Sequence, residues 1–368
     1  MKVLVINTNL TDKNGVASVI FNYLHAIDKN NLQMDLLSIN YPNQQYIDDV
    51  EKYGGRLYVI ERSSKNILKY WYDLYKLISK QKYDIVHIHG NSHTLVLELS
   101  AAWVGKCKVR IAHSHNTKCE HNIIHKIARP LFDYLTTDGL ACGVDAGKWM
   151  FGNRDFHVLN NGINTSNYVF SQKKRDEIRK KLNLSEDSFV IGHVGYFYEV
   201  KNHRHIIKVF EELHRRNNKY RLMLIGDGIL KDEIIRILKE KGLYEHSVLT
   251  GNISNVNDYL NAIDVIIMPS IYEGLPLTLI EEQANGLQCV VSENITCEAN
   301  KTGNVHFLSL DVPLRTWADC IEQLENDKSR TERSEYAVEK IKQCGYDIFD
   351  EAHFLKDYYF SAINRQRL

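Results

Sequence analysis

The stretch DVIIMPSIYEGLPLTLIEEQANG, residues 264–286, passes from an apolar run through a polar turn into a segment with helical spacing. The run DVIIMPS (264–270) is continuously apolar after its first residue, which is typical of a strand buried on both faces of a parallel sheet. LTLIEEQANG (277–286) predicts a helix that ends at Gly286. Glu273 and Glu281 bracket the Gly-Leu-Pro turn, so acids lie where α/β proteins bind ligands, at the carboxyl end of a strand.

The same alternation of apolar strands and amphipathic helices recurs in two blocks of the chain. The first block begins at KVLVIN (2–7), and the second begins at SFVIGHVGY (188–196) and ends at QCVVSEN (288–294), which we expect to be its final strand. A charged segment, 171–188, separates them. The pattern predicts an α/β protein with two doubly wound parallel-sheet domains, residues 1–168 and 184–345, with a ligand cleft between them.

The tail, residues 346–368, is rich in aromatic residues at helical spacing: Phe349, Phe354, Tyr358 and Phe360. It predicts a C-terminal helix that either docks on its own domain or crosses back to the first. Segment 61–82 combines an aromatic and aliphatic stripe with five lysines. We favour a helix that buries this stripe on its sheet; the alternative is a helix lying on an anionic membrane.

Composition limits the class of protein. The 368 residues hold 46 Lys and Arg and 46 Asp and Glu, so net charge gives no support for a nucleic-acid binder. The excess of basic residues falls in the first half, where residues 1–165 hold 19 Lys and Arg against 15 Asp and Glu. Seven cysteines without a CxxC pair indicate reduced thiols, and no apolar run is long enough to span a membrane. We therefore expect a cytoplasmic protein with at most peripheral membrane contact.

Several nucleotide and metal motifs are missing. The sequence has no GxGxxG after its first strand, no P-loop, no Asp-x-Asp and no GxSxG. The histidines at 87 and 89, and those at 113 and 115, would each share one strand face, and we favour a role in lining the cleft over metal binding. Gly15 directly precedes a helix, where backbone amides can approach an anion.

Two further segments suit a ligand that carries both phosphates and hydroxyl groups. Lys201 and Asn202 stand at a helix start after a strand, where a cation and backbone amides together favour a pyrophosphate. Glu273 and Glu281 bracket the amides of Leu275, Leu277 and Thr278 in the opening stretch. A sugar nucleotide fits this combination of groups.

The chain resembles family-4 glycosyltransferases, which have the GT-B fold, of the type that builds bacterial capsular or exopolysaccharides. The resemblance covers essentially the whole chain and rests on PSIYEGLPLTLIEEQANG, IGHVGYFYEVKNH, LIGDG, RIAHSHN and NNGIN in the family's order. It implies an acceptor-binding N-terminal domain, a C-terminal domain that binds the nucleotide sugar, and a last helix, 346–368, that packs back on the first domain.

The resemblance also implies roles for individual residues. Glu273, His115 and Lys201 would be catalytic, contacting the donor sugar (Glu273 and His115, with His113 as the alternative) and the diphosphate (Lys201). Glu281 would accept hydrogen bonds from the ribose hydroxyls. Other substrate-binding positions would be Gly15, Tyr196, Asn202, Thr250, Gly251, Leu275, Leu277 and Thr278.

The implied reaction is retaining transfer of a hexosyl group from a nucleotide sugar, a UDP-sugar by preference, to a lipid-linked saccharide, with neither a metal nor another cofactor. Two departures from the family pattern concern phosphate binding. Tyr196 occupies the place of the usual arginine, for which Arg204 is a candidate substitute, and Pro276 removes one backbone N–H. The alternatives are a catalytically weak partner subunit that binds a nucleotide sugar and a GT-B-fold sugar-nucleotide 2-epimerase.

Overall fold

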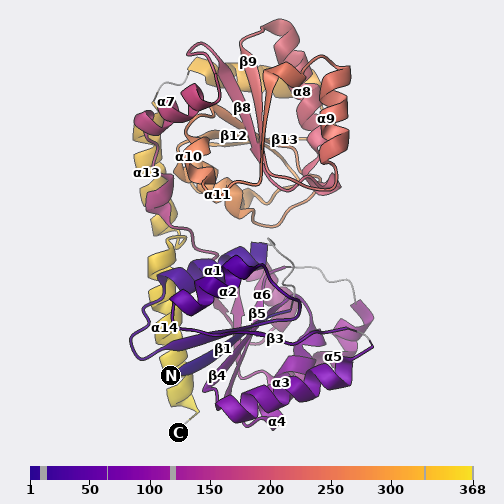
Figure 1. Ribbon diagram of the computed structural model, residues 1–368, viewed down its shortest axis with the longest axis vertical. Coiled ribbons are helices and arrows are strands. Elements are labelled where there is room, and N and C mark those ends of the chain that lie inside the picture. The colour runs from indigo at the N-terminus through magenta and orange to yellow at the C-terminus, as the bar shows by residue number, and fades with distance from the viewer. Residues whose placement is uncertain (9–14, 64, 117–121, 327–328, 367–368) are drawn as a thin grey trace. The chain divides into compact units, whose positions relative to one another are not determined.

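The computed structural model describes residues 1–8, 15–63, 65–116, 122–326 and 329–366. The chain divides into two compact units (Figure 1). Unit 1 comprises residues 1–163 together with 345–368, and unit 2 comprises residues 164–344. Among the described residues, no helix combines the length and the apolar character needed to cross a membrane.

Unit 1 is built on a seven-stranded sheet in the order β3-β2-β1-β4-β5-β6-β7. Every neighbouring pair is parallel. The central strands are buried along nearly their whole length, which explains their continuous apolar runs. The strands are β1 Lys2–Asn7, β2 Gln33–Ser38, β3 Leu57–Val59, β4 Ile85–Gly90, β5 Val109–Ser114, β6 Asp138–Ala141 and β7 His157–Val158.

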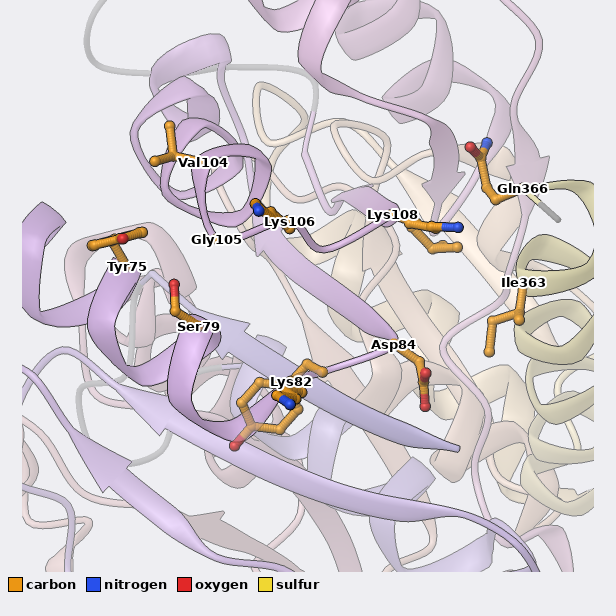
Figure 2. Close-up of a pocket in the computed structure, with 12 residues that line it drawn as sticks. Tyr75, Ser79, Lys82, Asp84, Val104, Gly105, Lys106, Lys108, Ile363 and Gln366 are labelled. Atoms are coloured by element: carbon orange, nitrogen blue, oxygen red, sulfur yellow. The ribbon is translucent and has the colours of Figure 1, made fainter.

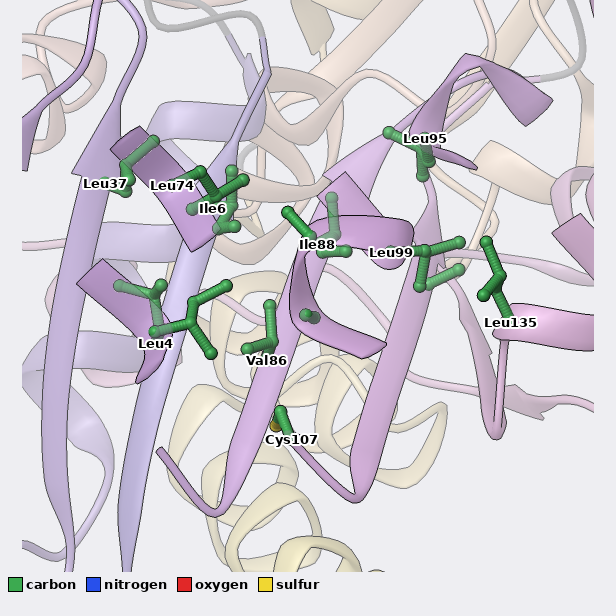
Figure 3. Close-up of a cluster of buried hydrophobic side chains, with 14 of the residues drawn as sticks. Leu4, Ile6, Leu37, Leu74, Val86, Ile88, Leu95, Leu99, Cys107 and Leu135 are labelled. Carbon is green, nitrogen blue, oxygen red and sulfur yellow. The ribbon is translucent and has the colours of Figure 1, made fainter. Parts of the chain in front are cut away.

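Helices cover the sheet of unit 1. They are α1 Gly15–Ala26, α2 Gln44–Lys52, α3 Ile67–Gln81, α4 Val96–Val104, α5 Asn122–Leu135, α6 Val144–Phe151 and α14 Ile348–Arg365, with a 3-10 turn, η1, at His93–Leu95. Figure 3 shows part of the core, in which Leu74 of α3 and Leu99 of α4 pack with Ile88 of β4. The apolar stripe of α3 is thus turned inward through Tyr70, Leu74 and Ile78, as core packing predicts.

The C-terminal helix α14 belongs to unit 1, where it lies against α1. Tyr346 and Ile348 exchange backbone hydrogen bonds with Ile163 (Ile163 N to Tyr346 O, 2.8 Å; Ile348 N to Ile163 O, 2.9 Å), so the two chain segments that leave and re-enter the unit run side by side. The docking face differs from the expected aromatic stripe. Of the four predicted aromatic residues only Tyr358 is buried, together with Leu355 and Tyr359, whereas Phe349, Phe354 and Phe360 are exposed.

Unit 2 repeats the plan with a six-stranded parallel sheet in the order β10-β9-β8-β11-β12-β13. The strands are β8 Phe189–Val194, β9 Tyr220–Ile225, β10 Ser247–Gly251, β11 Val265–Met268, β12 Gln288–Ser292 and β13 Val305–Leu308. The expectation that 288–294 is the last strand was wrong, because β13 adds an edge strand beside it. Only Val305 of β13 is buried, so it lacks the apolar run that marks the other strands.

The helices of unit 2 are α7 Gln172–Lys181, α8 His203–Arg216, α9 Lys231–Glu240, α10 Val256–Leu260, α11 Leu277–Ala284, α12 Leu314–Gln323 and α13 Arg330–Gln343; the 3-10 turns are η2 Thr165–Tyr168, η3 Glu199–Lys201, η4 Tyr244–His246, η5 Cys297–Ala299 and η6 Leu324–Asn326. The charged segment expected between the domains forms α7 and packs within unit 2. Arg175 and Arg179 of α7 both bind Asp264 (2.5 and 3.2 Å), which anchors the helix beside β11.

In both units the strand order reverses beside the first strand, between β1 and β4 and between β8 and β11. Connections from neighbouring strands leave in opposite directions at such a point, which opens a crevice at the carboxyl ends of the strands. In unit 2 the loops after β8 and β11 are those that carry Lys201 and Glu273.

Candidate active site

Lys201 and Glu273 form an ion pair in unit 2. Lys201 is the last residue of η3, after β8, and Glu273 lies in the loop that joins β11 to α11. Only 19% of the lysine side chain and 14% of the glutamate side chain are exposed. The Ser270 hydroxyl donates a hydrogen bond to the same carboxylate oxygen at 3.0 Å. A cation and a carboxylate are therefore fixed at the carboxyl ends of adjacent strands.

Short polar contacts hold the two loops together. Asn202 adopts a left-handed conformation (φ 55°) at the start of α8, and its side-chain amide donates to the Pro269 carbonyl at 3.2 Å. The Ile271 amide donates to the Val200 carbonyl at 2.8 Å. Asn is one of the residues that tolerate a left-handed turn, which explains its place directly before the helix. Asn202 therefore sets the position of Lys201 relative to the Glu273 loop.

Helix α11 begins directly after the Gly-Leu-Pro turn. Pro276 is its N-cap residue and accepts a hydrogen bond from the Leu279 amide at 3.1 Å. The amides of Leu277 and Thr278 belong to the first turn, where a helix offers no internal acceptor. Leu275 lies in the loop before the cap. The start of α11 thus offers backbone donors a few residues from Glu273, although proline itself contributes none.

Glu281 lies one turn further along α11 and is partly buried. Burial raises its pKa from 4.5 to about 7, against a smaller lowering effect of a hydrogen bond with the Tyr168 side chain. Tyr168 comes from η2, more than a hundred residues earlier, and nothing in the local pattern of the sequence marked it. Its hydroxyl orients the carboxylate that the sequence assigned to the ribose.

Two buried polar residues beside this constellation were missed. Glu282 is fully buried, and neither of its carboxylate oxygens has a hydrogen-bond partner among the described residues. Burial raises its pKa well above the usual range, and the charges of Glu281, Lys201 and Glu273 all act on it. The second is His193 at the end of β8, whose Nδ1 pairs with the Ile267 carbonyl at 2.9 Å. Nothing in the sequence pattern shows that these two polar side chains are buried, so neither could be predicted.

The remaining positions in unit 2 lie around Asp227. Tyr196 is 39% exposed, and the centroid of its ring lies 4.4 Å from that of the Tyr198 ring. The charge of Asp227 acts on Tyr196, and its carboxylate faces Gly251 at the end of β10. Thr250 precedes this glycine and donates to its carbonyl at 2.9 Å. The backbone links this group to the ion pair, since the Lys201 amide donates to the Tyr198 carbonyl at 3.1 Å.

Arg204 does not stand in for the arginine that Tyr196 replaces. Its guanidinium is held by two surface carboxylates, Glu199 and Glu233, each through a pair of hydrogen bonds of 2.6 to 3.1 Å. Both available forks of the side chain are therefore occupied, which leaves Lys201 as the cation beside Glu273.

Unit 1 contributes a cluster of four histidines on one face of β4 and β5. His87 Nδ1 pairs with the Tyr359 hydroxyl of α14 at 2.7 Å, and His87 Nε2 pairs with His113 Nδ1 at 3.1 Å. His89 Nδ1 pairs with His115 Nε2 at 2.7 Å. Burial lowers the pKa of His87 and of His115 to about 3, and burial followed by mutual repulsion lowers the pKa of His89 and His113 well below 6.5. All four rings are neutral near pH 7.

The nitrogens of His87, His89 and His113 lie within 4.8 Å of one another, a spacing that could hold a metal ion. Among the described residues, no carboxylate acts on the pKa of the four rings, and two of the three candidate ligands already face each other in a hydrogen bond. The cluster is thus neutral but incompletely satisfied, because His113 Nε2 and His115 Nδ1 are buried without a hydrogen-bond partner among the described residues.

The other candidate in unit 1, Gly15, is the first residue of α1 and is exposed. A Cβ built on it would meet no atom within 4 Å among those described. Of the candidate residues, Gly15 and His115 belong to unit 1, and those from Tyr196 to Glu281 belong to unit 2.

Both halves of the chain match known families. Residues 13–167 match Glycosyltransferase Family 4, and residues 174–342 match Glycosyl transferases group 1. EpsF of Bacillus subtilis (strain 168) is 31% identical over 350 residues, which cover 91% of this chain and 90% of EpsF. This chain is a family-4 glycosyltransferase.

Two further comparisons place this glycosyltransferase among its relatives. The UDP-Gal:alpha-D-GlcNAc-diphosphoundecaprenol alpha-1,3-galactosyltransferase of Escherichia coli is 25% identical over 344 residues, covering 88% of this chain and 87% of the relative. The crystal structure of Anabaena HepE in complex with UDP superimposes with a TM-score of 0.79 at 15% identity, covering 98% of this chain and all of HepE. The two Rossmann-like units are those of the GT-B fold, as the sequence predicted.

Proposed function

We propose that this glycosyltransferase moves a hexosyl group from a UDP-sugar to a lipid-linked saccharide, with retention of anomeric configuration, in the synthesis of a bacterial surface polysaccharide. Unit 2 would bind the donor and unit 1 the acceptor, and the reaction would take place at the cytoplasmic face of the membrane. A UDP-sugar and a diphosphoundecaprenol acceptor are both named for the E. coli galactosyltransferase relative, which supports this choice of substrates.

The observation that carries the proposal is the Lys201–Glu273 pair beside the start of α11. A diphosphate needs a cation and amide donors, and sugar hydroxyls need an acceptor; the pair and the first turn of α11 offer all three within one loop system. In the donor complex, Lys201 would turn to the diphosphate and Glu273 to the hydroxyls of the sugar. Glu281 would accept from the ribose, with Tyr168 fixing its orientation.

We further propose that leaving-group stabilisation needs no metal and no other cofactor. As the sugar–phosphate bond breaks, negative charge grows on the diphosphate, and Lys201 with the Leu277 and Thr278 amides would stabilise it electrostatically. The sequence lacks the Asp-x-Asp motif that holds a divalent ion in other sugar-nucleotide enzymes. Full activity after treatment with a chelator would support this assignment.

A second candidate is a partner subunit that binds a nucleotide sugar without turning it over. It is favoured by one observation, the low positive charge around the candidate phosphate site. Tyr196 replaces an arginine, and Arg204 is committed to Glu199 and Glu233. The sugar-nucleotide 2-epimerase reading has no comparable support in the contacts of unit 2.

The test combines donor binding with turnover. Purified protein is first screened by thermal shift against UDP- and GDP-sugars, because a bound donor raises stability by mass action. The donor selected is then incubated with a short-chain diphosphate-linked saccharide, and nucleotide release, product mass and anomeric configuration are measured. Binding and product formation are expected; binding without product for any acceptor would favour the partner subunit, and an inverted product would overturn the retaining assignment.

A further inference from the structure

Helix α5 exposes a continuous apolar face to solvent. Ile123 and Ile127 are each 75% exposed, and Ile124, Leu131 and Tyr134 are at least half exposed. With 100° per residue, these five side chains fall within about 100° of one another around the helix axis. Single exposed apolar residues are common on protein surfaces, but a contiguous stripe of five large ones marks an interaction surface.

The opposite face of α5 is already fixed to unit 1. Phe132 and Leu135 are buried in the core, and the His125 ring is stacked between His93 (3.8 Å between centroids) and Trp149 (4.5 Å). The exposed stripe therefore does not arise from a helix that has failed to dock. Its outward position is set by contacts on the other side.

The stripe continues onto the end of α4. The Trp103 ring meets the Tyr134 ring edge to face at 6.1 Å, and Val104 beside it is also exposed. Trp and Tyr are the side chains that prefer the boundary between lipid tails and headgroups. We call Trp103, Val104 and the five exposed residues of α5 the α4–α5 patch.

Lysines border this patch. Val104 also lines a hollow of about 650 Å³ with Lys82, Lys106 and Lys108, into which Asp84 contributes the one acidic side chain of the lining (Figure 2). Lys126 flanks the stripe on α5 itself and is exposed. Over residues 103–135 the chain holds six Lys and Arg against two acidic residues, although the whole chain is neutral.

The one acidic residue of α5, Asp133, is neutralised locally. Arg129 binds it at 2.8 Å and Arg154 at 3.2 Å. A positive, apolar surface of this kind repels a second copy of itself and attracts an anionic surface with an apolar interior. By contrast, α3, where the sequence placed the alternative membrane helix, buries most of its stripe in the core.

We propose that the α4–α5 patch docks this glycosyltransferase on an anionic phospholipid bilayer, with the apolar stripe of α5 at the level of the acyl chains and the lysines at the phosphates. This inference deepens the proposed function, because it identifies the surface on which a lipid-linked acceptor would be presented. It depends on residues of α4 and α5, none of which is among the candidate donor-binding residues, so the two can fail separately.

The test is flotation of the full chain with vesicles of phosphatidylcholine alone or of phosphatidylcholine with phosphatidylglycerol. Wild-type protein is expected to float with the anionic vesicles. Ile127→Asp is expected to lower the partition coefficient at least tenfold, because it replaces an inserted side chain by a charge. Lys126→Gln is expected to lower it about fivefold on anionic vesicles and not on neutral ones. Ile229→Asp in unit 2 is the matched control, since Ile229 is 74% exposed, and it is expected to bind like the wild type.

Three outcomes would overturn the proposal: no binding of wild-type protein to anionic vesicles, equal losses for Ile127→Asp and Ile229→Asp, or a wild-type dimer that Ile127→Asp converts to a monomer without changing vesicle binding. The last would assign the patch to a second copy of the chain. UDP binding by the same preparations, measured without lipid, is expected to be equal in the wild type, Ile127→Asp and Lys126→Gln. Wild-type protein that binds UDP but fails to float with anionic vesicles contradicts only the membrane inference, and wild-type protein that floats but does not bind UDP contradicts only the proposed donor.

Discussion

The candidate groups of the two units are in opposite electrostatic states. In unit 2, Lys201 and Glu273 are charged and paired. In unit 1, His87, His89 and His113 are buried and His115 is partly buried, and lowered pKa values keep all four rings neutral. A diphosphate must be met by charge, whereas sugar hydroxyls can be met by neutral donors and acceptors. The difference therefore supports the proposed assignment of the nucleotide to unit 2 and of the uncharged saccharide groups to unit 1.

Replacing Lys201 by methionine is expected to have the largest effect on turnover, because it removes the cation of the charged pair in unit 2. Without the cation, the charge that develops on the leaving diphosphate is met by backbone amides alone, and turnover is expected to fall about a thousandfold. Steady-state rates with donor and acceptor in excess measure this loss. Lys201→Arg should recover part of the rate, since it keeps the charge.

Lys231→Met is the matched control for this substitution. Lys231 also forms an ion pair in unit 2, with Asp227 at 2.9 Å, but it lies on α9 away from Glu273. Its loss is expected to change turnover less than about threefold, because an exposed ion pair contributes little free energy. Equal losses for the two lysines would show that general charge, and not the position of Lys201, supports the reaction.

The two glutamates of unit 2 are expected to divide binding and turnover. Glu281→Gln should weaken UDP binding about tenfold, because a carboxylate accepts ribose hydrogen bonds more strongly than an amide. Glu273→Gln should lower turnover about a hundredfold with little effect on UDP affinity. Calorimetric UDP binding and initial rates on both variants separate these effects; equal losses of UDP affinity would refute the division.

Glu281 also predicts a pH dependence of binding. Its pKa is raised to about 7, so the carboxylate forms as the pH rises from 6 to 8. UDP affinity should therefore increase across this range in the wild type, by up to about tenfold. In Glu281→Gln the increase attributable to residue 281 should disappear, and a slope that persists unchanged would assign it to another group, such as the phosphate itself.

The neutral histidines of unit 1 predict a loss of stability in acid. In the unfolded chain they bind protons below about pH 6.5, whereas in the folded protein their lowered pKa values keep them neutral, so the unfolded state takes up more protons. Each should cost about 1 kcal/mol of the free energy of unfolding between pH 7.5 and 5.5. Glu281 and Glu351, whose pKa values are raised to about 7, act in the opposite direction.

Chemical denaturation at both pH values measures this dependence. His87→Gln should reduce the difference in unfolding free energy between pH 7.5 and 5.5 by about 1 kcal/mol. A pH dependence that is equal in His87→Gln and the wild type would mean that the imidazole is protonated in the folded protein.

The candidate residues of unit 2 were easier to bring together from the sequence than those of unit 1 for a physical reason. Lys201 and Glu273 each lie in the loop after an apolar strand, and in a parallel sheet the carboxyl ends of adjacent strands meet at one edge. The β11–turn–α11 unit could thus be recognised from one continuous stretch. Tyr168 and Glu282 could not, because their roles depend on which distant residues cover them.

The histidine cluster and the tail show the same limit. The shared face of His87 with His89, and of His113 with His115, followed from strand alternation. Tyr359, which completes the cluster, lies 272 residues from His87. The aromatic spacing of the tail pointed instead to Phe349, Phe354, Tyr358 and Phe360, of which only Tyr358 is buried. Strand β13 was missed because an edge strand needs no continuous apolar run.

Tyr196→Arg is expected to have the smallest effect of these substitutions. It adds to unit 2 the positive charge that the family pattern carries at this position. The position is partly exposed, beside the ring of Tyr198, and Asp227 would compete for the new guanidinium. The gain in UDP affinity should therefore be limited to about threefold to fivefold. Tyr198→Arg is the control for added charge alone, because Tyr198 lies two residues from Tyr196 and is similarly exposed. If Tyr196→Arg binds UDP more tightly and also turns over faster, the wild type is an enzyme whose donor site is tuned to low charge. If Tyr196→Arg binds UDP more tightly but neither protein turns the donor over, the missing arginine does not limit catalysis, and the partner subunit is favoured.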